Sequence, residues 1–567
     1  MTYNGKLEDS KRTGETVRHG KEGLTHTSAG ITHETAEDKE LNNEEAHESR
    51  PASLYSSQSQ EDVEDIEALS AVRSNSPPYS VFSKRKKHLI VFLAGCGGFF
   101  SPLSANIYFP ALTTLTREFK VSSTLMNLTL TSYMIFQGLA PTIFGDLADM
   151  AGRRPAYSIG FIIYIGANIG LALQSSYSAL FILRCLQATG SSATIALGNG
   201  VVADIATSSE RGIWMGYVTS GPMVAPAVAP VIGGLLAQFL GWRAIFWFLV
   251  ILATIYLIPF FIFFPETARD VVGNGSIPPQ GWNMSLLNYL ELRKARSSQN
   301  DLTRATSREE SRAAQQELAR KRKLRLPNPL GTLRVIKQKD VGLLLFYNSL
   351  IYTAFYDVIA SAPYLFTNMY GFNDLQIGLA FIPFGVGAMI APTIAGQLLD
   401  WNYHRVAKLN NFPIDRKRGD DLRGFPLERA RLMVIVPSIA VGTTVLLCYG
   451  WVVEVETSLA ALLVLHFLMG LFLTGAFNCM SVMLVDYYPM SPSTATAANN
   501  LVRCFMGAAG TGIINIMIDA MGRGWCFTFI AGIVLLFSPI LWILLQWGPK
   551  WREERRVKME TTKESHS

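Results

Sequence analysis

The segment GDLADMAGRRP, residues 145–155, decides the fold that we expect for the rest of this sequence. It places carboxylates, glycines and arginines between two apolar runs, residues 124–147 and 155–175. A helix that crosses a bilayer needs roughly 20 apolar residues, and both runs are long enough. We therefore expect residues 145–155 to be a tight connection between two membrane-spanning helices.

Outward from this loop the sequence contains further apolar runs of the same length. The predicted spans are residues 89–112, 124–147, 155–175, 179–203, 213–238, 244–264, 341–367, 376–399, 432–453, 459–485, 493–518 and 525–547. A polar, basic stretch, residues 265–340, divides them six and six and contains Lys321-Arg322-Lys323. The predicted fold class is an all-α integral membrane protein with 12 transmembrane helices in two six-helix halves.

This pattern also predicts the domain organisation. We expect a first half at residues 84–264, a cytoplasmic linker at 265–340 and a second half at 341–547. Residues 548–567 form a C-terminal tail. Residues 1–83 are rich in Ser, Glu and Thr and too poor in large apolar residues to offset the entropy of ordering the chain. We therefore expect a disordered N-terminal tail.

The composition excludes several classes of protein. Of 567 residues, 49% are hydrophobic and 17% charged, whereas soluble domains carry roughly 25% charged residues. The six cysteines form no CxxC pair, so neither a disulfide framework nor a metal site is indicated. The motifs GxxxxGK[ST], HExxH and GxSxG are absent. We therefore expect that the chain is not an enzyme and has no catalytic residue, no cofactor and no ATP-driven step. The excess of basic residues outside the N-terminal tail predicts loops that set the membrane topology rather than a nucleic-acid binding surface.

The distribution of basic residues predicts the orientation. If the N-terminus is cytoplasmic, the outer loops hold only Arg117, Lys120, Arg243 and Arg523. The inner side holds the basic run 84–87, the linker and the C-terminal tail. Cytoplasmic loops are enriched in Lys and Arg, so both termini are predicted to be cytoplasmic.

A weak internal repeat supports two equivalent halves. Gly145–Asp149 (GDLAD) closes the second span, and Gly396–Asp400 (GQLLD) closes the second span of the other half. An arginine follows each, at Arg153 and Arg405. Internally repeated halves are typical of secondary transporters.

On these residues the sequence resembles the major facilitator superfamily. Gly145, Asp149, Gly152, Arg153 and Arg154 match the signature of that superfamily between spans two and three. The resemblance implies a gate that holds the two halves together on the cytoplasmic side. In this gate Asp149 faces the N-terminus of a second-half helix, and Arg153 faces an acid such as Asp204. The alternative is a surface loop whose charges only set the topology.

Two further motifs resemble those of proton-coupled antiporters. Arg184-x-x-Gln187-x-x-Gly190 matches in span four, with Ala188 where glycine is usual. Span five contains APAVAPVIGG, residues 225–234, in which Pro226, Pro230, Gly233 and Gly234 match and alanines replace two glycines. Prolines four residues apart can shape and stiffen this helix, or the small residues can simply allow close packing.

Other stretches resemble the fungal twelve-span drug:proton antiporters, in the quinidine-resistance-type and organic-acid exporter branch. They are IYFPAL at 107–112, PETAR at 265–269, GSIPP at 275–279 and DYYPMSPSTATAANNLVR at 486–503. The resemblance implies a monomer in the membrane lipid that exports drugs or secondary metabolites across the fungal plasma membrane in exchange for protons. Export of a citrate-like organic acid is the alternative, and a transporter-like sensor is a third hypothesis.

Arg184 is the most informative position within a predicted span. An arginine at the centre of a membrane helix costs about 2.5–3.5 kcal/mol on insertion scales, so it must face the bundle interior or a cavity. Gln187 lies on the same helix face. Together they can hold an anionic group of a substrate or shift the pKa of a nearby acid. The alternative is a structural arginine paired to backbone carbonyls.

Asp357 is the one acid that we place well inside a span. A carboxyl group in a low dielectric can take up a proton near neutral pH, as proton coupling requires. Its alternatives are a place at the cavity mouth or a hydrogen bond to Ser361. Arg503 follows Asn499 and Asn500 on a polar face of span eleven, where it either lines the inner vestibule or extends to the membrane surface.

Overall fold

The computed structural model describes residues 79–567 except 208–209, 280, 299–312, 314–329, 412–424, 489–491 and 565–567. The predicted tail, residues 1–83, lies almost wholly outside the described residues, and so does Lys321-Arg322-Lys323. All regular elements of the described residues are helices. The described part of the chain is therefore all-α, as predicted.

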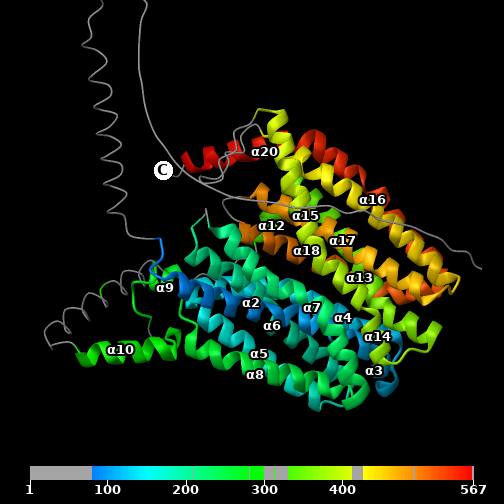
Figure 1. Ribbon diagram of the computed structural model, residues 1–567, viewed down its shortest axis with the longest axis horizontal. Coiled ribbons are helices and arrows are strands. Elements are labelled where there is room, and N and C mark those ends of the chain that lie inside the picture. Colours follow the sequence, from blue (N-terminus) through cyan, green and yellow to red (C-terminus); the bar gives the residue numbers. More distant parts are fainter. Residues whose placement is uncertain are drawn as a thin grey trace, which may run out of the picture. The chain divides into compact units, whose positions relative to one another are not determined.

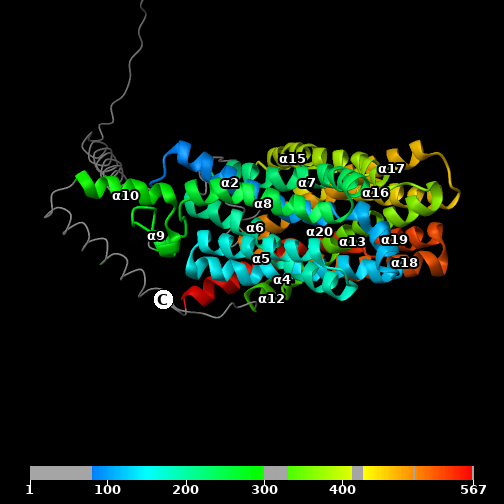
Figure 2. The same ribbon diagram turned by 90° about the horizontal axis from the view of Figure 1, so that it is seen from below.

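The first half is built from long helices that run back and forth (Figures 1 and 2). They are α2 (Lys84–Asn106), α3 (Leu112–Phe119), α4 (Ser123–Ala151), α5 (Arg153–Leu173), α6 (Tyr177–Ile205), α7 (Arg211–Leu240) and α8 (Arg243–Phe263), with the 3-10 turn η1 (Phe109–Ala111) between α2 and α3. Side-chain caps begin several of them: Ser83, Ser122 and Ser176 each accept a bond from a backbone N–H of the first turn. α7 remains one helix despite its prolines.

The second half repeats this arrangement. Its helices are α13 (Lys339–Tyr370), α14 (Asp374–Ala380), α15 (Ile382–Leu409), α16 (Leu427–Glu454), α17 (Leu459–Tyr487), α18 (Pro492–Met521), α19 (Arg523–Leu536) and α20 (Pro539–Glu564). α20 continues beyond the predicted span because Arg555 pairs with the buried Asp340 and Arg552 with the buried Glu428. The first part of the predicted C-terminal tail is thus helical and tied to the second half.

The described part of the linker packs against the cytoplasmic end of the first half. It contains α9 (Arg269–Val272), η2 (Gly281–Asn283) and α10 (Leu286–Ser298), followed later by α12 (Leu330–Ile336). The backbone of Tyr79 accepts a bond from Arg269, whose guanidinium carbon also lies 3.6 Å from the centre of the Tyr79 ring. The linker is thereby fastened to the residues that precede α2.

Eleven helical stretches of the described chain are long and apolar enough to cross a membrane. The second predicted span corresponds to α4, which is long enough but is not among these eleven stretches. Its polar side chains are covered by protein: Asn127 and Thr131 donate to the backbone carbonyls of Thr511 and Ala508 on α18. A hydropathy threshold alone therefore misses α4, and the fold is a twelve-span bundle.

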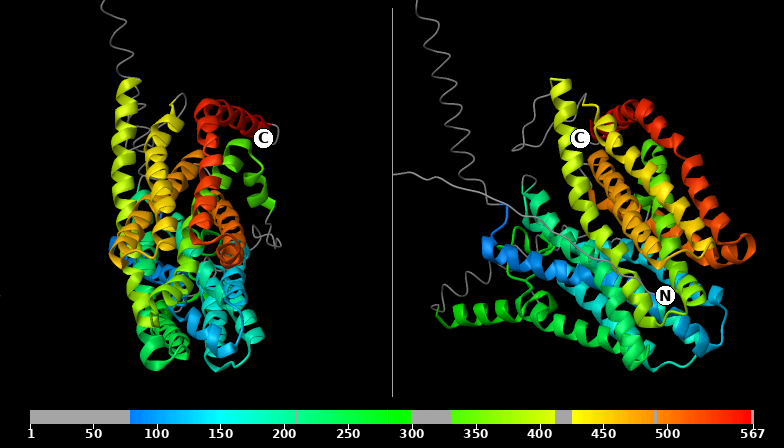
Figure 3. Two further views of the ribbon diagram at one scale, coloured as in Figure 1. Left: turned by 90° about the vertical axis from the view of Figure 1, so that its right-hand side faces the viewer. Right: turned by 45° about the vertical axis from the view of Figure 1, so that its right-hand side comes forward.

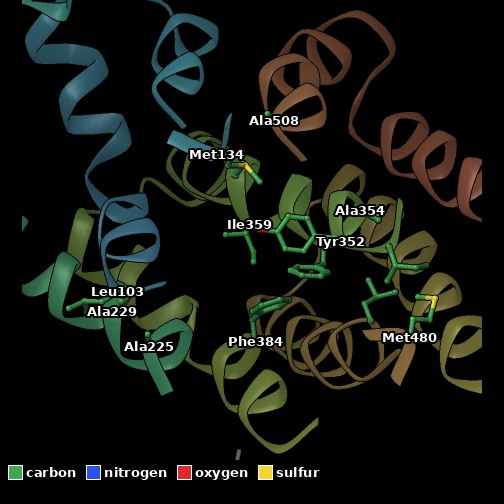
Figure 4. Packing of buried hydrophobic residues seen from close by; sticks show 14 of the residues in the cluster. Leu103, Met134, Ala225, Ala229, Tyr352, Ala354, Ile359, Phe384, Met480 and Ala508 are labelled. Carbon is green, nitrogen blue, oxygen red and sulfur yellow. The ribbon is translucent and has the colours of Figure 1, made fainter. Parts of the chain in front are cut away.

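The two halves pack together at the end of the bundle opposite α9 and α10. In Figure 1, α7 and α15 approach each other near α3 and α14, and the halves diverge away from that end; Figure 3 shows the same arrangement from two other sides. One cluster of buried hydrophobic residues extends through both halves, from Leu103 to Met480 (Figure 4). This end is the outer one by the positive-inside rule, so the structure is closed on the outside.

Candidate functional site

A narrow cavity lies between the two halves, near the middle of the bundle. Its lining comes from both halves: Ala105, Phe109, Leu130, Tyr133, Met134, Gln137, Arg184, Tyr356 and Thr511. The volume is about 10 Å³, which is room for about one water molecule. Pockets that hold drug-sized ligands measure about 300–1,000 Å³. The centre of the transporter-like bundle is therefore closed around Arg184 in this conformation.

Arg184 is fully buried between two aromatic rings. Its guanidinium carbon lies 4.2 Å from the ring centre of Tyr108 and 4.3 Å from that of Tyr133. Nη1 donates to Oε1 of Gln187 at 2.6 Å and to the backbone oxygen of Ser104 at 3.3 Å. Cation–π contacts of this kind offset part of the cost of burying the charge.

The two remaining donors of Arg184 are unsatisfied. Nε and Nη2 have no hydrogen-bond partner, and no ion pair among the described residues includes Arg184. Arg184 thus bonds to one backbone carbonyl and to Gln187, while two of its donor nitrogens have no partner. A buried cation with unused donors is suited to receive a carboxylate or another anionic group.

Gln187 orients Arg184. Its amide nitrogen donates to Oδ1 of Asn168 at 2.7 Å, so its carbonyl oxygen is turned toward the guanidinium. Asn168 in turn donates to the backbone oxygen of Tyr164, whose hydroxyl lies 2.6 Å from that of Ser104. The sequence motif thus folds into a network across α2, α5 and α6 that holds the guanidinium beside the cavity.

Arg503 is a second cation without a carboxylate among its described contacts. Its Nε and Nη2 lie 3.1 and 2.7 Å from Oδ1 of Asn500, and its guanidinium lies 5.0 Å from the ring centre of Tyr352. Asn500 also donates to the backbone oxygen of Gln137 in the first half, at 3.0 Å. Arg503 therefore contacts aromatic side chains and is linked through Asn500 to the junction between the halves.

The structure separates Asn499 from Arg503. Asn499 accepts a bond from Asn348 at 2.8 Å and donates to Ser481 at 3.2 Å. This polar cluster lies between α13, α17 and α18 within the second half. Asn499 therefore bonds to residues within the second half, whereas Arg503 bonds to Asn500.

Asp357 is buried, but it is not among the residues that line the central cavity. Its neighbour Tyr356 lines the cavity, while Asp357 packs against Gly510 of α18, where an added Cβ would lie 2.5 Å from Oδ1. Oδ1 has no hydrogen-bond partner. The Ser361 hydroxyl donates to backbone oxygens, including that of Asp357, rather than to the carboxylate. The structure does not bring Asp357 and Arg184 together.

The residues of the 145–155 loop form a charge cluster within the first half. Nη1 of Arg153 lies 2.7 Å from Oδ1 of Asp149, and its Nε lies 2.9 Å from Oδ2 of Asp204. Asp204 is buried, whereas the Asp149 side chain is 58% exposed. The hydrogen-bonded partner of Asp149 is thus Arg153, in its own half, and the space around Gly145 is open. This arrangement fits a conformation in which the cytoplasmic ends of the halves have moved apart.

Glu266 is the residue that sequence reasoning missed, although it stands in the PETAR segment. Its carboxylate accepts four backbone N–H bonds, from Arg153 at 2.8 Å, Arg154 at 3.2 Å, and Thr267 and Ala268 at 2.9 Å each. Two of these are the first N–H groups of α5, so Glu266 caps that helix. Burial raises the pKa of Glu266, and the four donors oppose this rise.

Gly152 is required by this cap. Its φ angle is +113°, and an added Cβ would overlap Oε2 of Glu266. Arg154 points to the other side of α5 from Arg153 and donates to the backbone oxygen of Phe261 at 3.1 Å, at the end of α8. The two adjacent arginines therefore contact different parts of the first half.

Two of the motif residues of α7, Pro230 and Gly234, lie where the two halves meet. An added Cβ on Gly234 would lie 2.6 Å from the backbone oxygen of Asp374, and one on Gly378 would lie 2.5 Å from that of Pro230. Gly233 instead packs against the backbone of Ile107, and Pro226 is half-buried one turn before Pro230. Small residues on α7 thus allow α14 to approach closely at the outer end.

Comparison with known proteins gives consistent results. A model of the Major Facilitator Superfamily matches residues 94–412. The chain is similar to the MFS-type transporter phiD of Fungal sp., with 44% identity covering 87% of this chain and 73% of that protein. It is also similar to the MFS-type transporter tstD of Talaromyces stipitatus, with 40% identity covering 86% of this chain and 87% of that protein. Citrate exporter 1 of Aspergillus niger is 37% identical, over 86% of this chain and 92% of the exporter.

Solved structures of lower sequence identity share the fold. The xylose transporter XylE of E. coli in a partially occluded inward-open conformation aligns with a TM-score of 0.55 at 14% identity, covering 81% of this chain and 98% of XylE. The human organic anion transporter MFSD10 aligns with a TM-score of 0.52 at 16% identity, covering 82% of this chain and all of that one.

Proposed function

The chain belongs to the Major Facilitator Superfamily and is a multi-pass membrane transporter rather than an enzyme, and from that premise we propose that it exports small organic anions in exchange for protons. The export runs from the fungal cytosol across the plasma membrane, and the chain acts as a monomer. The observation that carries the proposal is Arg184, buried beside the central cavity between two tyrosine rings with two donors unused.

The substrate that fits this site best is a secondary metabolite or drug with a carboxylate or phenolate on an aromatic or apolar skeleton. Its anionic group would accept bonds from Nε and Nη2 of Arg184. The rest of the cavity wall is largely apolar and aromatic, with Phe109, Tyr133, Met134 and Tyr356. Apolar walls with few polar groups suit the burial of such a skeleton.

A second candidate substrate is a small polycarboxylate such as citrate. Arg184 and Arg503 are two cations near the inter-half junction, and the described contacts of both lack a carboxylate. The similarity to a citrate exporter at 37% identity favours the same substrate. A polycarboxylate would engage both arginines, whereas a metabolite with one anionic group needs Arg184 alone.

Proton coupling is assigned to Asp357. A buried carboxylate without a cation beside it is costly to keep charged, and Oδ1 of Asp357 has no partner. Asp357 lies outside the cavity, so the proton and the substrate would occupy separate sites. Coupling would then act through the packing of α13 against α18, because Tyr356 lines the cavity and Asp357 contacts Gly510.

The transport cycle would alternate between this outer-closed arrangement and one that is closed on the cytoplasmic side. In the second arrangement, the exposed carboxylate of Asp149 would turn toward the second half, and together with Arg153 it would hold the cytoplasmic ends of the halves together. These charge-assisted contacts are strong enough to define a state and can be broken by rocking of the halves.

The test is export from transporter-deficient yeast that expresses the full chain. Cells are loaded with fluorescein, an anionic aromatic dye, with rhodamine 6G, a cationic dye, or with labelled citrate. We expect proton-gradient-dependent loss of fluorescein, abolished by a protonophore. Loss of citrate alone would support the second candidate, and loss of rhodamine 6G alone would contradict an anionic substrate. Movement of none of the three would favour the sensor hypothesis.

A further inference from the structure

A larger cavity lies outside the central site, at the cytoplasmic end of α8. Its volume is about 450 Å³, and it is lined by Arg154, Phe261, Ile262, Gly281, Met284, Ser285, Leu286 and Tyr289. These residues come from the start of α5, the end of α8 and the linker that leads into α10. The cavity is therefore built where the first half leaves the membrane.

A buried cation forms one wall of this cavity. Arg154 is 6% exposed, donates to the backbone oxygen of Phe261, and stands 5.5 Å from the centre of the Phe261 ring. Its acidic neighbour is Glu266, whose carboxylate already accepts four backbone N–H bonds. Arg293 and Lys294 add two exposed positive charges on α10, one turn beyond Tyr289. Glu291, between Tyr289 and Arg293, lies 3.6 Å from Nζ of Lys86. Basic side chains therefore outnumber acidic ones around the cavity.

An apolar strip of α8 leads to this cavity from within the membrane. Trp247, Ile251, Ile255, Ile258 and Phe261 are each between 39% and 59% exposed. They recur at intervals of three or four residues, which places them along one face of the helix. Phe261, at the cytoplasmic end of the strip, also lines the cavity. A membrane-spanning helix exposes such a face to lipid chains.

We propose that this cavity binds an anionic phospholipid of the cytoplasmic leaflet. The lipid phosphate would face Arg154, with Arg293 and Lys294 nearby, and an acyl chain would lie along the α8 strip. Basic pockets on the cytoplasmic side of membrane helices are suited to anionic headgroups because their positive charges attract the negatively charged lipids of that leaflet. A neutral soluble ligand would match neither the cation nor the apolar strip.

The bound lipid would join α8, α5 and α10, which contribute the walls. Arg154 is adjacent to Arg153, which belongs to the charge cluster with Asp149 and Asp204. The backbone N–H groups of both arginines donate to Glu266. Occupation of the cavity would therefore stabilise the linker against the first half. This inference does not depend on the identity of the exported substrate.

The test is lipid binding to the purified full chain in detergent, followed by native mass spectrometry and by thermal unfolding. The probes are phosphatidylserine, phosphatidylcholine and the soluble sn-glycerol 3-phosphate. We expect phosphatidylserine to bind about tenfold more tightly than phosphatidylcholine, which corresponds to about 1.4 kcal/mol. Glycerol 3-phosphate at millimolar concentration should not compete, since it lacks the chains that lie on the α8 strip.

Four variants make the test specific. Arg154→Gln should remove the preference for phosphatidylserine, and Arg154→Lys should retain most of it. Tyr289→Glu, at an exposed position of α10, places a negative charge at the cavity without touching the first-half core and should also remove it. Arg243→Gln, which removes an exposed arginine at the outer end of α8, is the matched control and should keep it.

Three results would overturn the proposal. They are equal affinity for the two lipids, a preference that survives both Arg154→Gln and Tyr289→Glu, and full competition by glycerol 3-phosphate, which would show that a free phosphate compound suffices. If Arg154→Gln unfolds, Tyr289→Glu still decides the outcome.

Discussion

The hydroxyl of Thr114 lies 2.8 Å from Oδ1 and 2.7 Å from Oδ2 of Asp374 and so joins the two halves at the outer end. Thr114 belongs to α3 of the first half, and Asp374 is the first residue of α14 in the second. Next to them, the ring of Phe109 stacks on that of Phe381, with 6.0 Å between the ring centres. The outer closure therefore combines a charge-assisted hydrogen bond with aromatic packing.

The first prediction concerns this bond. Thr114→Val removes the donor from a buried carboxylate, a loss of about 1.5–3 kcal/mol for a hydrogen bond to a charged group. We expect the balance between outer-closed and outer-open states to shift at least about tenfold toward the open state. Electron–electron distance measurements between spin labels at positions 120 and 456, both in outer loops, report the shift. Thr113→Val is the control. An unchanged distribution of spin-label distances in Thr114→Val would show that the Thr114–Asp374 bond does not hold the outer end closed.

The second prediction concerns the close approach of α7 and α14. In Gly378→Ala the new Cβ would lie 2.5 Å from the backbone oxygen of Pro230, so the two helices cannot close fully. The variant should lower export severalfold and favour the outer-open state. Gly532→Ala, which places its Cβ in open space on α19, is the matched control. Equal export by the two variants would show that this contact is unimportant.

The third prediction concerns recognition of the anion. Arg184→Gln removes the charge and should lower the affinity for the exported anion by about 10²-fold, since a charge-assisted pair contributes about 1.5–3 kcal/mol. Arg184→Lys keeps the charge but loses the planar guanidinium that stacks between Tyr108 and Tyr133, so it should restore only part of the affinity. Substrate binding to purified protein measures both. Wild-type affinity in Arg184→Gln would exclude Arg184 from the site.

The fourth prediction concerns coupling. Asp357→Asn retains the shape of the side chain but cannot exchange a proton, so export should lose its dependence on an imposed pH gradient while substrate binding persists. Flux into inverted vesicles, measured with and without the gradient, tests this. Asp519→Asn, at the outer end of α18, should behave as wild type. A normal gradient response in Asp357→Asn would place the proton site elsewhere.

The fifth prediction concerns the cap on α5. Glu266→Gln presents an amide nitrogen where the structure requires only acceptors, and a buried N–H group is left without a partner. We expect a loss of about 1–3 kcal/mol of stability, seen as a melting temperature lower by several degrees in detergent. Glu210→Gln, at a half-exposed residue, should melt as wild type does. Identical melting of both variants would show that the cap contributes little.

Much of the fold followed from local pattern. Apolar length located the helices and the basic loops set their orientation, because a bilayer imposes both rules on any chain that crosses it. The polar helix α4 was also found, although its hydropathy alone falls short of a span. Glu266 was named only as part of a motif, since nothing in the sequence indicates that its carboxylate meets the start of α5, more than 100 residues earlier in the chain.

Apolar length and polar pattern alone predict a twelve-span bundle of two halves with Arg184 turned inward, because hydrocarbon tolerates neither an unpaired backbone nor an exposed arginine. Only the tertiary structure decided which polar residues meet. It joined Gln187 to Asn168, directed Asn499 toward Asn348 and set Asp357 behind the cavity wall. The physical reason is that helix periodicity fixes the face a residue lies on, while the neighbour of that face depends on how separate helices pack.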